Sequence, residues 1–336
     1  MNMPRLGVLL LSVVFAFGAC GAAAESTLKF ASYVPPQSFS AKHVLAPFAR
    51  AIEKASGGDL KVQDFFGGSL GRDPFKQYSL VIDGIADIGF VQPQYSSGQF
   101  PDNSLFELPY LMRNAEEGSV AMWRMYKKGL LRGYDDIKLA GLYMTSMLAI
   151  HARKPVHSAT DLRGMKIRAS GNASLAYLKA VGAVPVGMAT TEVTEAISRG
   201  TLDGTMTNWV GLVTFRTHNV VRHHFTGPLG TITFIIPINK KSWDGLSAKA
   251  KAAVDKFGGE YMARMAGKAY DEGDQVEMQK LKVDANRTFA AETPADEQKA
   301  RAMMKPIYEE WIRATPEGRK KFDALQAILA DIRAGR

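Results

Sequence analysis

The sequence predicts an α/β protein with two similar lobes, because strand-like and helix-like segments alternate and the same order occurs twice. The first copy contains a strand within 26–38, an amphipathic helix at 40–56, a strand at 59–65, a helix at 74–83 and a strand at 86–91. Such alternation favours a largely parallel sheet with helices packed against it.

The second copy contains a strand at 165–170, a helix at 174–181, a strand at 184–187, a helix at 191–199 and a strand at 202–208. Gly84 and Gly200 follow the last helix of each copy, where a left-handed glycine commonly ends a helix. Asp87 and Asp203 come three residues later, and both pairs are 116 residues apart. The repeat is too loose to prove a duplication, but it indicates two similar lobes.

The remaining segments indicate how the lobes are joined. We expect a helix at 115–129, an extended segment at 138–149, a buried strand at 231–239, a helical tract at 247–285, and helices at 295–314 and 317–333. Late helices that pack back on both copies imply more than one crossing between lobes. We therefore expect one lobe to contain 25–147 and 235–275, and the other to contain 148–234 and 276–336, with a ligand cleft between them.

The first 24 residues have the layout of a secretory signal, with Arg5 ahead of a twelve-residue apolar run that ends at Phe17. This run is shorter than the roughly 20 residues that span a bilayer. Ala22 and Ala24 form a small-x-small site, so we expect cleavage after Ala24 and export to the periplasm. The alternative is a lipidated Cys20, although the bulky Phe17 is a poor residue three positions before it.

Composition excludes several kinds of protein. The formal charge is +9, and loss of Arg5, the only charged residue in the leader, lowers it to +8. The Lys and Arg residues are scattered, so a nucleic acid partner is not expected, although a basic surface favours the arrival of anions. Cys20 is the only cysteine, and its removal leaves no thiol for disulfide, metal or nucleophilic chemistry. A chain of this length tends to divide into two domains.

A ligand in an open α/β sheet binds beyond the carboxyl ends of the strands. That rule selects Ser32–Gln37, Asp64–Ser69, Val91–Gln94, Arg168–Asn172, Met206–Trp209 and Thr231–Phe234. These segments hold one cation, several amides and hydroxyls and an aromatic ring, without a convincing acidic pair or a histidine. This set favours binding over catalysis and calls for no cofactor. Its candidate contacts are Pro36, Gln92, Arg168, Asn172, Thr207, Asn208 and Trp209.

Arg168 is the leading candidate. On its strand, Lys166 and Arg168 face one side while Met165 and Ile167 face the other. It also stands at the strand end, where the chain turns into Ser170–Asn172. Its guanidinium has a planar fork that matches a carboxylate. An ordinary surface arginine is the alternative.

Four segments form a recognisable pattern: DLRGMKIRASGNASLAYLKAVGAVPVGMATTEVTEAISRGTLDG (161–204), FFGGSLGRD (65–73), GIADIGF (84–90) and FELPYLM (106–112). On these segments the chain resembles the solute receptors of tripartite ATP-independent periplasmic (TRAP) transporters. The resemblance covers most of the chain beyond the leader and implies a type II-like periplasmic binding protein fold, with mixed sheets and a long helix linking two lobes. It also implies a monomer that delivers a small organic acid to a membrane permease driven by an ion gradient.

The family pattern assigns roles to individual residues. The arginine of K-I-R, here Arg168, is implied to bind the ligand carboxylate. Asn208 lies one residue later than the family's common asparagine, so Thr207 competes for that contact, and Trp209 is expected as an aromatic cleft wall. Sugar-acid members carry a second arginine at the position of Leu148. Its absence favours a monocarboxylate such as a keto, hydroxy or aromatic acid, with a dicarboxylate as the alternative and Lys166 or Arg153 as its partner.

Two enzyme or metal readings compete with a receptor. Gly67-Gly68-Ser69-Leu70-Gly71 matches G-x-S-x-G between a strand and a helix, as the nucleophile of an esterase would. So short a pattern occurs often by chance, and a glycine-rich turn explains it without a nucleophile. His223–His224 suggest a metal, but adjacent residues point apart and no ligand spacing accompanies them, so a surface pair is expected.

Overall fold

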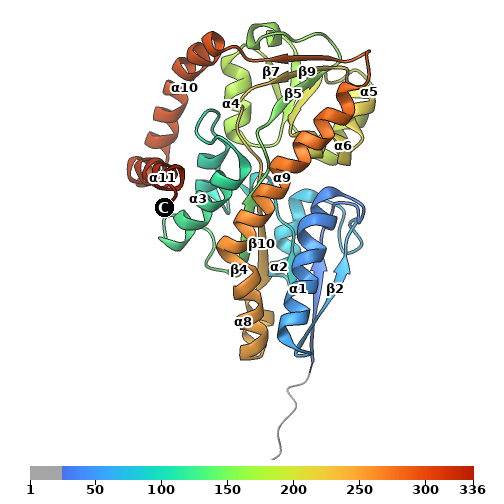
Figure 1. The fold of residues 1–336 in the computed structure, drawn as a ribbon, viewed down its shortest axis with the longest axis vertical. Coiled ribbons are helices and arrows are strands. Elements are labelled where there is room, and N and C mark those ends of the chain that lie inside the picture. Colours follow the sequence, from blue (N-terminus) through green and yellow to red (C-terminus); the bar gives the residue numbers. More distant parts are fainter. Residues whose placement is uncertain (1–24) are drawn as a thin grey trace, which may run out of the picture.

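The computed structural model describes residues 25–336 (Figure 1). The predicted leader, with Cys20 and the cleavage site after Ala24, lies outside the described residues. Among the residues described, no helix has the length and apolar character that crossing a membrane requires.

The first sheet has five strands in the order β2-β1-β3-β10-β4. Their bounds are β1 (Ser26–Ala31), β2 (Leu60–Phe65), β3 (Ile88–Gly89), β4 (Ile137–Met144) and β10 (Thr233–Asn239). The strands β2, β1 and β3 are parallel, while β10 is antiparallel to both β3 and β4. The sheet is therefore mixed.

The second sheet has six strands in the order β11-β9-β5-β8-β6-β7. Their bounds are β5 (Ala149–Ala152), β6 (Lys166–Ala169), β7 (Val184–Gly187), β8 (Gly204–Thr207), β9 (His223–Thr226) and β11 (Thr288–Ala291). The strands β7, β6 and β8 are parallel, and β5 is antiparallel to β8 and β9. Followed from the β7 edge, the second sheet therefore has the order β7-β6-β8-β5-β9, which matches β2-β1-β3-β10-β4 of the first sheet, and β11 is an additional edge strand. The prediction of two similar lobes is confirmed.

The glycine–aspartate repeat builds the same turn in both sheets. Gly84 and Gly200 have φ angles of +70° and +76°, the left-handed region that favours glycine. The carboxylate of Asp87 accepts from the backbone N–H of Lys29 at 2.8 Å, and that of Asp203 accepts from Lys166 at 2.8 Å. Each aspartate also donates its own N–H to the carbonyl of the same lysine. Each aspartate therefore ties the start of a sheet strand to its neighbour.

Eleven helices cover the sheets in the described chain. They are α1 (Ala46–Ser56), α2 (Gln77–Ile82), α3 (Ala115–Lys127), α4 (Asn172–Ala180), α5 (Val193–Ser198), α6 (Trp209–Thr214), α7 (Lys240–Asp244), α8 (Ala248–Phe257), α9 (Gly259–Lys282), α10 (Pro294–Ala314) and α11 (Gly318–Arg333). Short 3-10 turns η3 (Pro93–Ser96), η4 (Pro101–Glu107) and η6 (Thr190–Glu192) matter for the site.

The helical tract expected at 247–285 is in fact two helices, so that prediction is wrong in detail. The break falls at Gly258 and Gly259, and Gly259 has a φ of +58°. A Cβ at Gly258 would lie 2.0 Å from the carbonyl oxygen of Ala140, so the chain comes too close to β4 for any side chain. Tertiary contact with β4 therefore ends α8.

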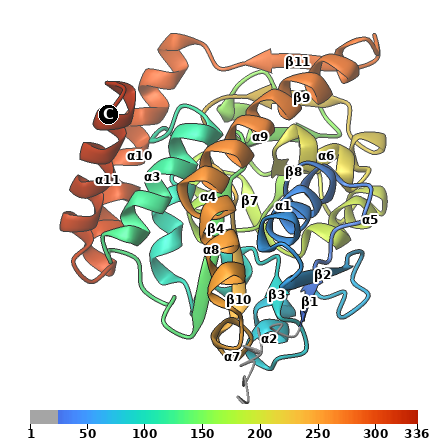
Figure 2. The same ribbon diagram turned by 60° about the horizontal axis from the view of Figure 1, so that its bottom comes forward.

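Three connections join the two sheets in the described chain. Residues 145–148 lead from β4 to β5, and residues 227–232 lead from β9 back to β10; these segments are bonded by Thr145 N–H to Ile232 O and Leu148 N–H to Gly230 O, both 2.9 Å. The third is α9, which packs on β4 and on α6 and runs beside both lobes (Figures 1 and 2). The expected long linking helix is therefore α9.

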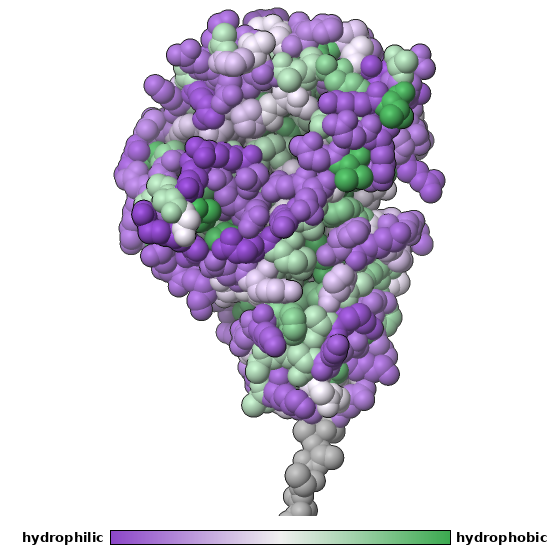
Figure 3. Space-filling view, viewed as in Figure 1, coloured by the Kyte–Doolittle hydropathy of each residue, from purple (hydrophilic) through white to green (hydrophobic). Residues whose placement is uncertain are grey.

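The C-terminal helices lie on the outside, at the left of Figure 1. α10 packs on α4, whereas α11 packs on α3, with Lys321 and Arg132 both bonded to the buried Asp102. Helix α11 thus packs on α3 of the first lobe, whereas the predicted bounds assign residues 276–336 to the second lobe. Those lobe bounds stay a prediction. Hydrophilic residues dominate the α10–α11 side of the face in Figure 3.

Candidate ligand-binding site

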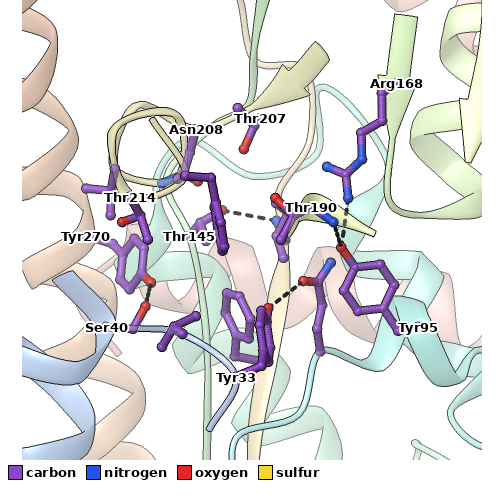
Figure 4. A pocket seen from close by; sticks show the side chains of 17 residues that line it. Tyr33, Ser40, Tyr95, Thr145, Arg168, Thr190, Thr207, Asn208, Thr214 and Tyr270 are labelled. Carbon is purple, nitrogen blue, oxygen red and sulfur yellow. Dashed lines mark hydrogen bonds between the residues drawn. The ribbon is translucent and has the colours of Figure 1, made fainter. Parts of the chain in front are cut away.

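A cavity of about 30 Å³ lies between the sheets, beyond the carboxyl ends of β1, β6 and β8 (Figure 4). It is lined by Tyr33, Val34, Ser40, Gln92, Tyr95, Thr145, Arg168, Thr190, Thr207, Asn208, Val210, Gly211, Thr214, Phe215, Ile232, Phe234 and Tyr270. Strand-end loops from both lobes supply most of these residues. Five of the six segments that the strand-end rule selected supply lining residues, and Asp64–Ser69 supplies none.

The wall formed by the first lobe and α9 is aromatic. Tyr33 and Phe234 both stack on Phe90, at centroid distances of 5.8 and 4.4 Å. The hydroxyl of Tyr270 is bonded to Ser40 at 2.7 Å, and Tyr33 donates to Gln92 at 3.3 Å. Burial raises the pKa of Tyr270 to about 12 and that of Tyr33 well above its ordinary value, so these hydroxyls stay neutral at neutral pH.

The opposite wall carries Arg168, near the end of β6, with only 1% of its surface exposed. Its strand alternates as predicted: Ile167 enters the core and Arg168 faces the cavity, although Lys166 on the same face is exposed. Within residues 25–336, Arg168 forms no ion pair. It is also the only cation among the described residues that line the cavity. A buried cation without a counter-charge is costly unless an anion joins it.

Backbone contacts occupy part of the Arg168 guanidinium. Its Nε and Nη2 donate to the carbonyl of Met188 at 3.0 and 2.8 Å, and Nη2 also donates to the Tyr95 hydroxyl at 2.8 Å. The Nη1 nitrogen has no partner among residues 25–336. The predicted planar fork is therefore only partly open toward the cavity.

Thr207 and Asn208 both line the cavity, so both candidates for the second polar contact are brought together. The Asn208 amide donates to Asp274 of α9 at 2.8 Å, and Asp274 also accepts from the N–H groups of Trp209 and Val210. Burial raises the pKa of Asp274 to about 6. The carbonyl of Thr207 accepts from His151 at 3.1 Å. Helix α9 and β5 thus hold the end of β8 in place.

Three predicted residues lie elsewhere. Trp209 does not line the cavity but is buried against His151, His224 and Phe289. It is the first residue of α6, and its side chain points in a different direction from that of Asn208. The expectation of a cleft-wall tryptophan is wrong in this structure. Asn172 lines a separate hollow with Glu107, because it is the first residue of α4. Pro36 contacts the turn at Gly67, outside the cavity.

Sequence reasoning missed most of the aromatic wall. Tyr33 and Phe234 lie inside segments that the strand-end rule selected, and their size and apolar rings were the available signal. Tyr95 falls one residue beyond such a segment, and Tyr270 comes from the middle of α9. No local pattern places a helix residue beside strand ends so far away in sequence.

The sites of the alternative readings also have a structural explanation. Ser69 is exposed in a turn where Gly67 and Gly68 have φ angles of +74° and +77°, and no hydrogen bond in the described chain joins it to a histidine. The turn geometry accounts for the glycines. Arg153 and Lys166, the expected partners of a second carboxylate, do not line the cavity.

The expected surface histidine pair is wrong for His224, which is fully buried and bonded to His151 through their Nδ1 atoms at 2.8 Å. Burial lowers the pKa of His151 to about 3 and that of His224 to about 2, so both are neutral at neutral pH. In the described chain, no group of three or more His, Cys, Asp or Glu residues is suited to a metal ion.

Comparisons with known proteins identify the family of the chain. The family described as bacterial extracellular solute-binding protein, family 7, matches residues 30–314. A TRAP solute-binding protein from Rhodoferax ferrireducens T118, solved with copurified benzoate, is 28% identical with a TM-score of 0.86, covering 91% of this chain and 98% of its own. A marine metagenome TRAP protein specific for aromatic acids, solved with 3-hydroxybenzoate, is 28% identical with a TM-score of 0.87 and the same coverage.

A further relative is the C4-dicarboxylate-binding periplasmic protein DctP of Rhodobacter capsulatus, 26% identical over 308 residues, 90% of this chain and 91% of its own. The family match covers well over half of the sequence, and its members are binding receptors. The chain therefore belongs to family 7 of the bacterial extracellular solute-binding proteins, as a TRAP transporter receptor and not an enzyme.

Proposed function

We propose that this receptor binds a monocarboxylate with an apolar or aromatic body and delivers it to its TRAP permease. One observation carries the proposal: Arg168, a buried cation without an ion-pair partner in residues 25–336, faces an aromatic wall across the cavity. The carboxylate would meet Arg168, and the body would lie against Tyr33, Phe234 and Tyr270. Either Thr207 or Asn208 would supply a second polar contact.

Two further observations support this ligand class. The Nε2 of Gln92 is buried without a partner in the described chain, so it can donate to a hydroxyl or keto oxygen of the ligand. Two relatives of similar fold bind benzoate and 3-hydroxybenzoate. The competing ligand is a C4-dicarboxylate, the class bound by the Rhodobacter relative. Its second carboxylate would lack a cation on the described cavity wall, and desolvating an unpaired charge is expensive.

The leader completes the proposal. Residues 1–24 would direct export to the periplasm and be removed after Ala24, leaving a monomeric receptor with Glu25 at its start. Intact mass of periplasmic material tests this directly. A diacylglycerol-modified Cys20 would contradict it.

A thermal-shift screen of organic acids tests the ligand class. A ligand at about 100 times its dissociation constant stabilises the folded state by roughly 2.7 kcal/mol, which raises the melting temperature by several degrees. Benzoate, 3-hydroxybenzoate and aliphatic keto or hydroxy acids should include the strongest hits. Succinate, malate and neutral sugars should give no shift. Hits restricted to dicarboxylates would overturn the monocarboxylate assignment.

A further inference from the structure

Tyr95 joins the two lobes at the cavity through one oxygen atom. It lies on η3, after β3 of the first sheet, with its ring against Phe75 at 4.6 Å. Its hydroxyl oxygen accepts from Arg168 Nη2 at 2.8 Å and from the backbone N–H of Thr190 at 2.9 Å. Both donors belong to the second lobe, and Figure 4 shows their hydrogen bonds to Tyr95. Among residues 25–336, Tyr95 is the only residue of the first lobe that forms a hydrogen bond with the guanidinium.

A count of hydrogens shows which donors remain. A phenol has two acceptor positions and one O–H, so an oxygen that already accepts twice must direct its hydrogen elsewhere. No acceptor for that hydrogen exists among residues 25–336. Arg168 has five N–H groups, of which Nε and Nη2 supply three to Met188 and Tyr95, leaving the two on Nη1.

The geometry of the guanidinium brings these free donors together. The Nη2 hydrogen on the Nε side goes with Nε to the Met188 carbonyl. The other Nη2 hydrogen, on the Nη1 side, goes to Tyr95. The tyrosine oxygen therefore lies on the same edge of the guanidinium as Nη1, in one of the two places that a bidentate carboxylate would occupy.

We propose that Tyr95 donates its hydroxyl hydrogen to the ligand carboxylate, which is held jointly by Arg168 Nη1 and Tyr95. This rests on the proposed function and adds a ligand contact from the first lobe. Because Tyr95 belongs to the first lobe and Arg168 to the second, a carboxylate held by both residues bridges the lobes, so the tyrosine couples recognition of the carboxylate to closure. A ligand without this anionic group would leave the donors unsatisfied in a closed cleft.

The test is Tyr95→Phe in the chain without its leader, with Tyr134→Phe as the matched control. Tyr134 is also buried, and its hydroxyl donates to Asn103 at 2.8 Å, away from the cavity. Calorimetry with benzoate and 3-hydroxybenzoate gives the affinity, and small-angle X-ray scattering gives the compaction on ligand addition. Removal of one hydrogen bond to a charged group predicts an affinity loss of about ten- to a hundredfold for Tyr95→Phe.

The expected pattern separates ligand contact from a merely structural role. Tyr95→Phe should lower the melting temperature of the ligand-free protein, because Arg168 and Thr190 each lose an acceptor, and it should also lose affinity and compaction. Tyr134→Phe should lower that temperature and keep the wild-type affinity. An affinity within twofold of wild type for Tyr95→Phe overturns the inference and leaves the proposed function standing. A wild-type protein that binds none of the aromatic, keto or hydroxy acids overturns both.

Discussion

The two lobes place equivalent strand ends at the cleft, yet only one strand carries a charge there. In the first lobe β1 pairs with β3 through Phe30 and Ile88, and in the second β6 pairs with β8 through Ile167 and Gly204. The next residue of β1 is Ala31, and the next residue of β6 is Arg168. Asp87 and Asp203 hold the two strands by the same pair of hydrogen bonds.

This difference shows how a repeated framework becomes a selective site. The framework delivers two strand ends to one cavity, and the residue type at each end decides the chemistry. Ala31 packs into a small core cluster with Leu80 and Ala86, whereas Arg168 faces the cavity and gives its wall a charge. One cation opposite aromatic rings suits a ligand with one charged end and an apolar body.

The largest expected effect comes from removing the charge that distinguishes the lobes. Arg168→Ala should weaken binding of the best acid about a hundredfold or more, because an unpaired buried carboxylate costs roughly 3–5 kcal/mol. Arg168→Lys should also bind poorly, since an ammonium cannot replace the planar donors. Lys166→Ala is the control, because it removes an exposed cation of the same strand. Calorimetry showing near wild-type affinity for Arg168→Ala would falsify the assignment.

The buried histidine pair should make the second lobe sensitive to acid. His151 and His224 face each other across β5 and β9, and Arg287 lies 3.5 Å from His224. Their folded pKa values, about 3 and about 2, lie below the ordinary value, so their stabilisation is complete above about pH 6.5 and is lost as pH falls. The loss approaches roughly 1.4 kcal/mol per histidine and pH unit.

Denaturant unfolding of wild type and His224→Leu between pH 7.5 and about 5.5 checks this expectation. The raised pKa values of Asp274, about 6, and Glu107, about 8, act in the opposite direction in both proteins. The informative quantity is therefore the unfolding free energy of wild type minus that of His224→Leu. This difference should become smaller, or change sign, as the pH is lowered, because wild type loses more stability than the variant. A difference that stays constant with pH would contradict the neutral-pair assignment.

The paired aspartates test the equivalence of the lobes directly. Asp203→Ala and Asp87→Ala each remove the acceptor of a strand N–H, that of Lys166 in β6 and that of Lys29 in β1, which predicts a loss of about 1–3 kcal/mol of stability for either variant. Only Asp203 holds the strand that carries Arg168, so Asp203→Ala should also weaken ligand binding, by several-fold. Asp87→Ala should retain its affinity in calorimetry. Equal affinity losses in both variants would mean that the strand ends are not independent.

The smallest expected effect belongs to Ser69. Ser69→Ala should bind ligand as the wild type does, because Ser69 is exposed in a glycine turn outside the cavity. The wild type should hydrolyse an activated ester no faster than background in a stopped-flow assay. A serine-dependent burst of product would revive the esterase reading.

The sequence by itself determined the features that depend on local periodicity and turn chemistry. It predicted the strand–helix order, the left-handed glycines at Gly84 and Gly200, and the position of Arg168 at a strand end facing the cavity. These follow from neighbours in the chain, because strand alternation and helix termination act over a few residues.

Only the tertiary structure decided which side chains meet Arg168. Tyr95 and Tyr270 come from segments 73 residues before and 102 residues after it, on a 3-10 turn and on α9. Trp209 is adjacent in sequence to the cavity residue Asn208, yet its side chain packs away from the cavity. His224 is fully buried, although its neighbour His223 is only partly buried. The direction of a side chain at a helix start, and the partners it meets, depend on how distant elements pack, and packing leaves no local pattern in the sequence.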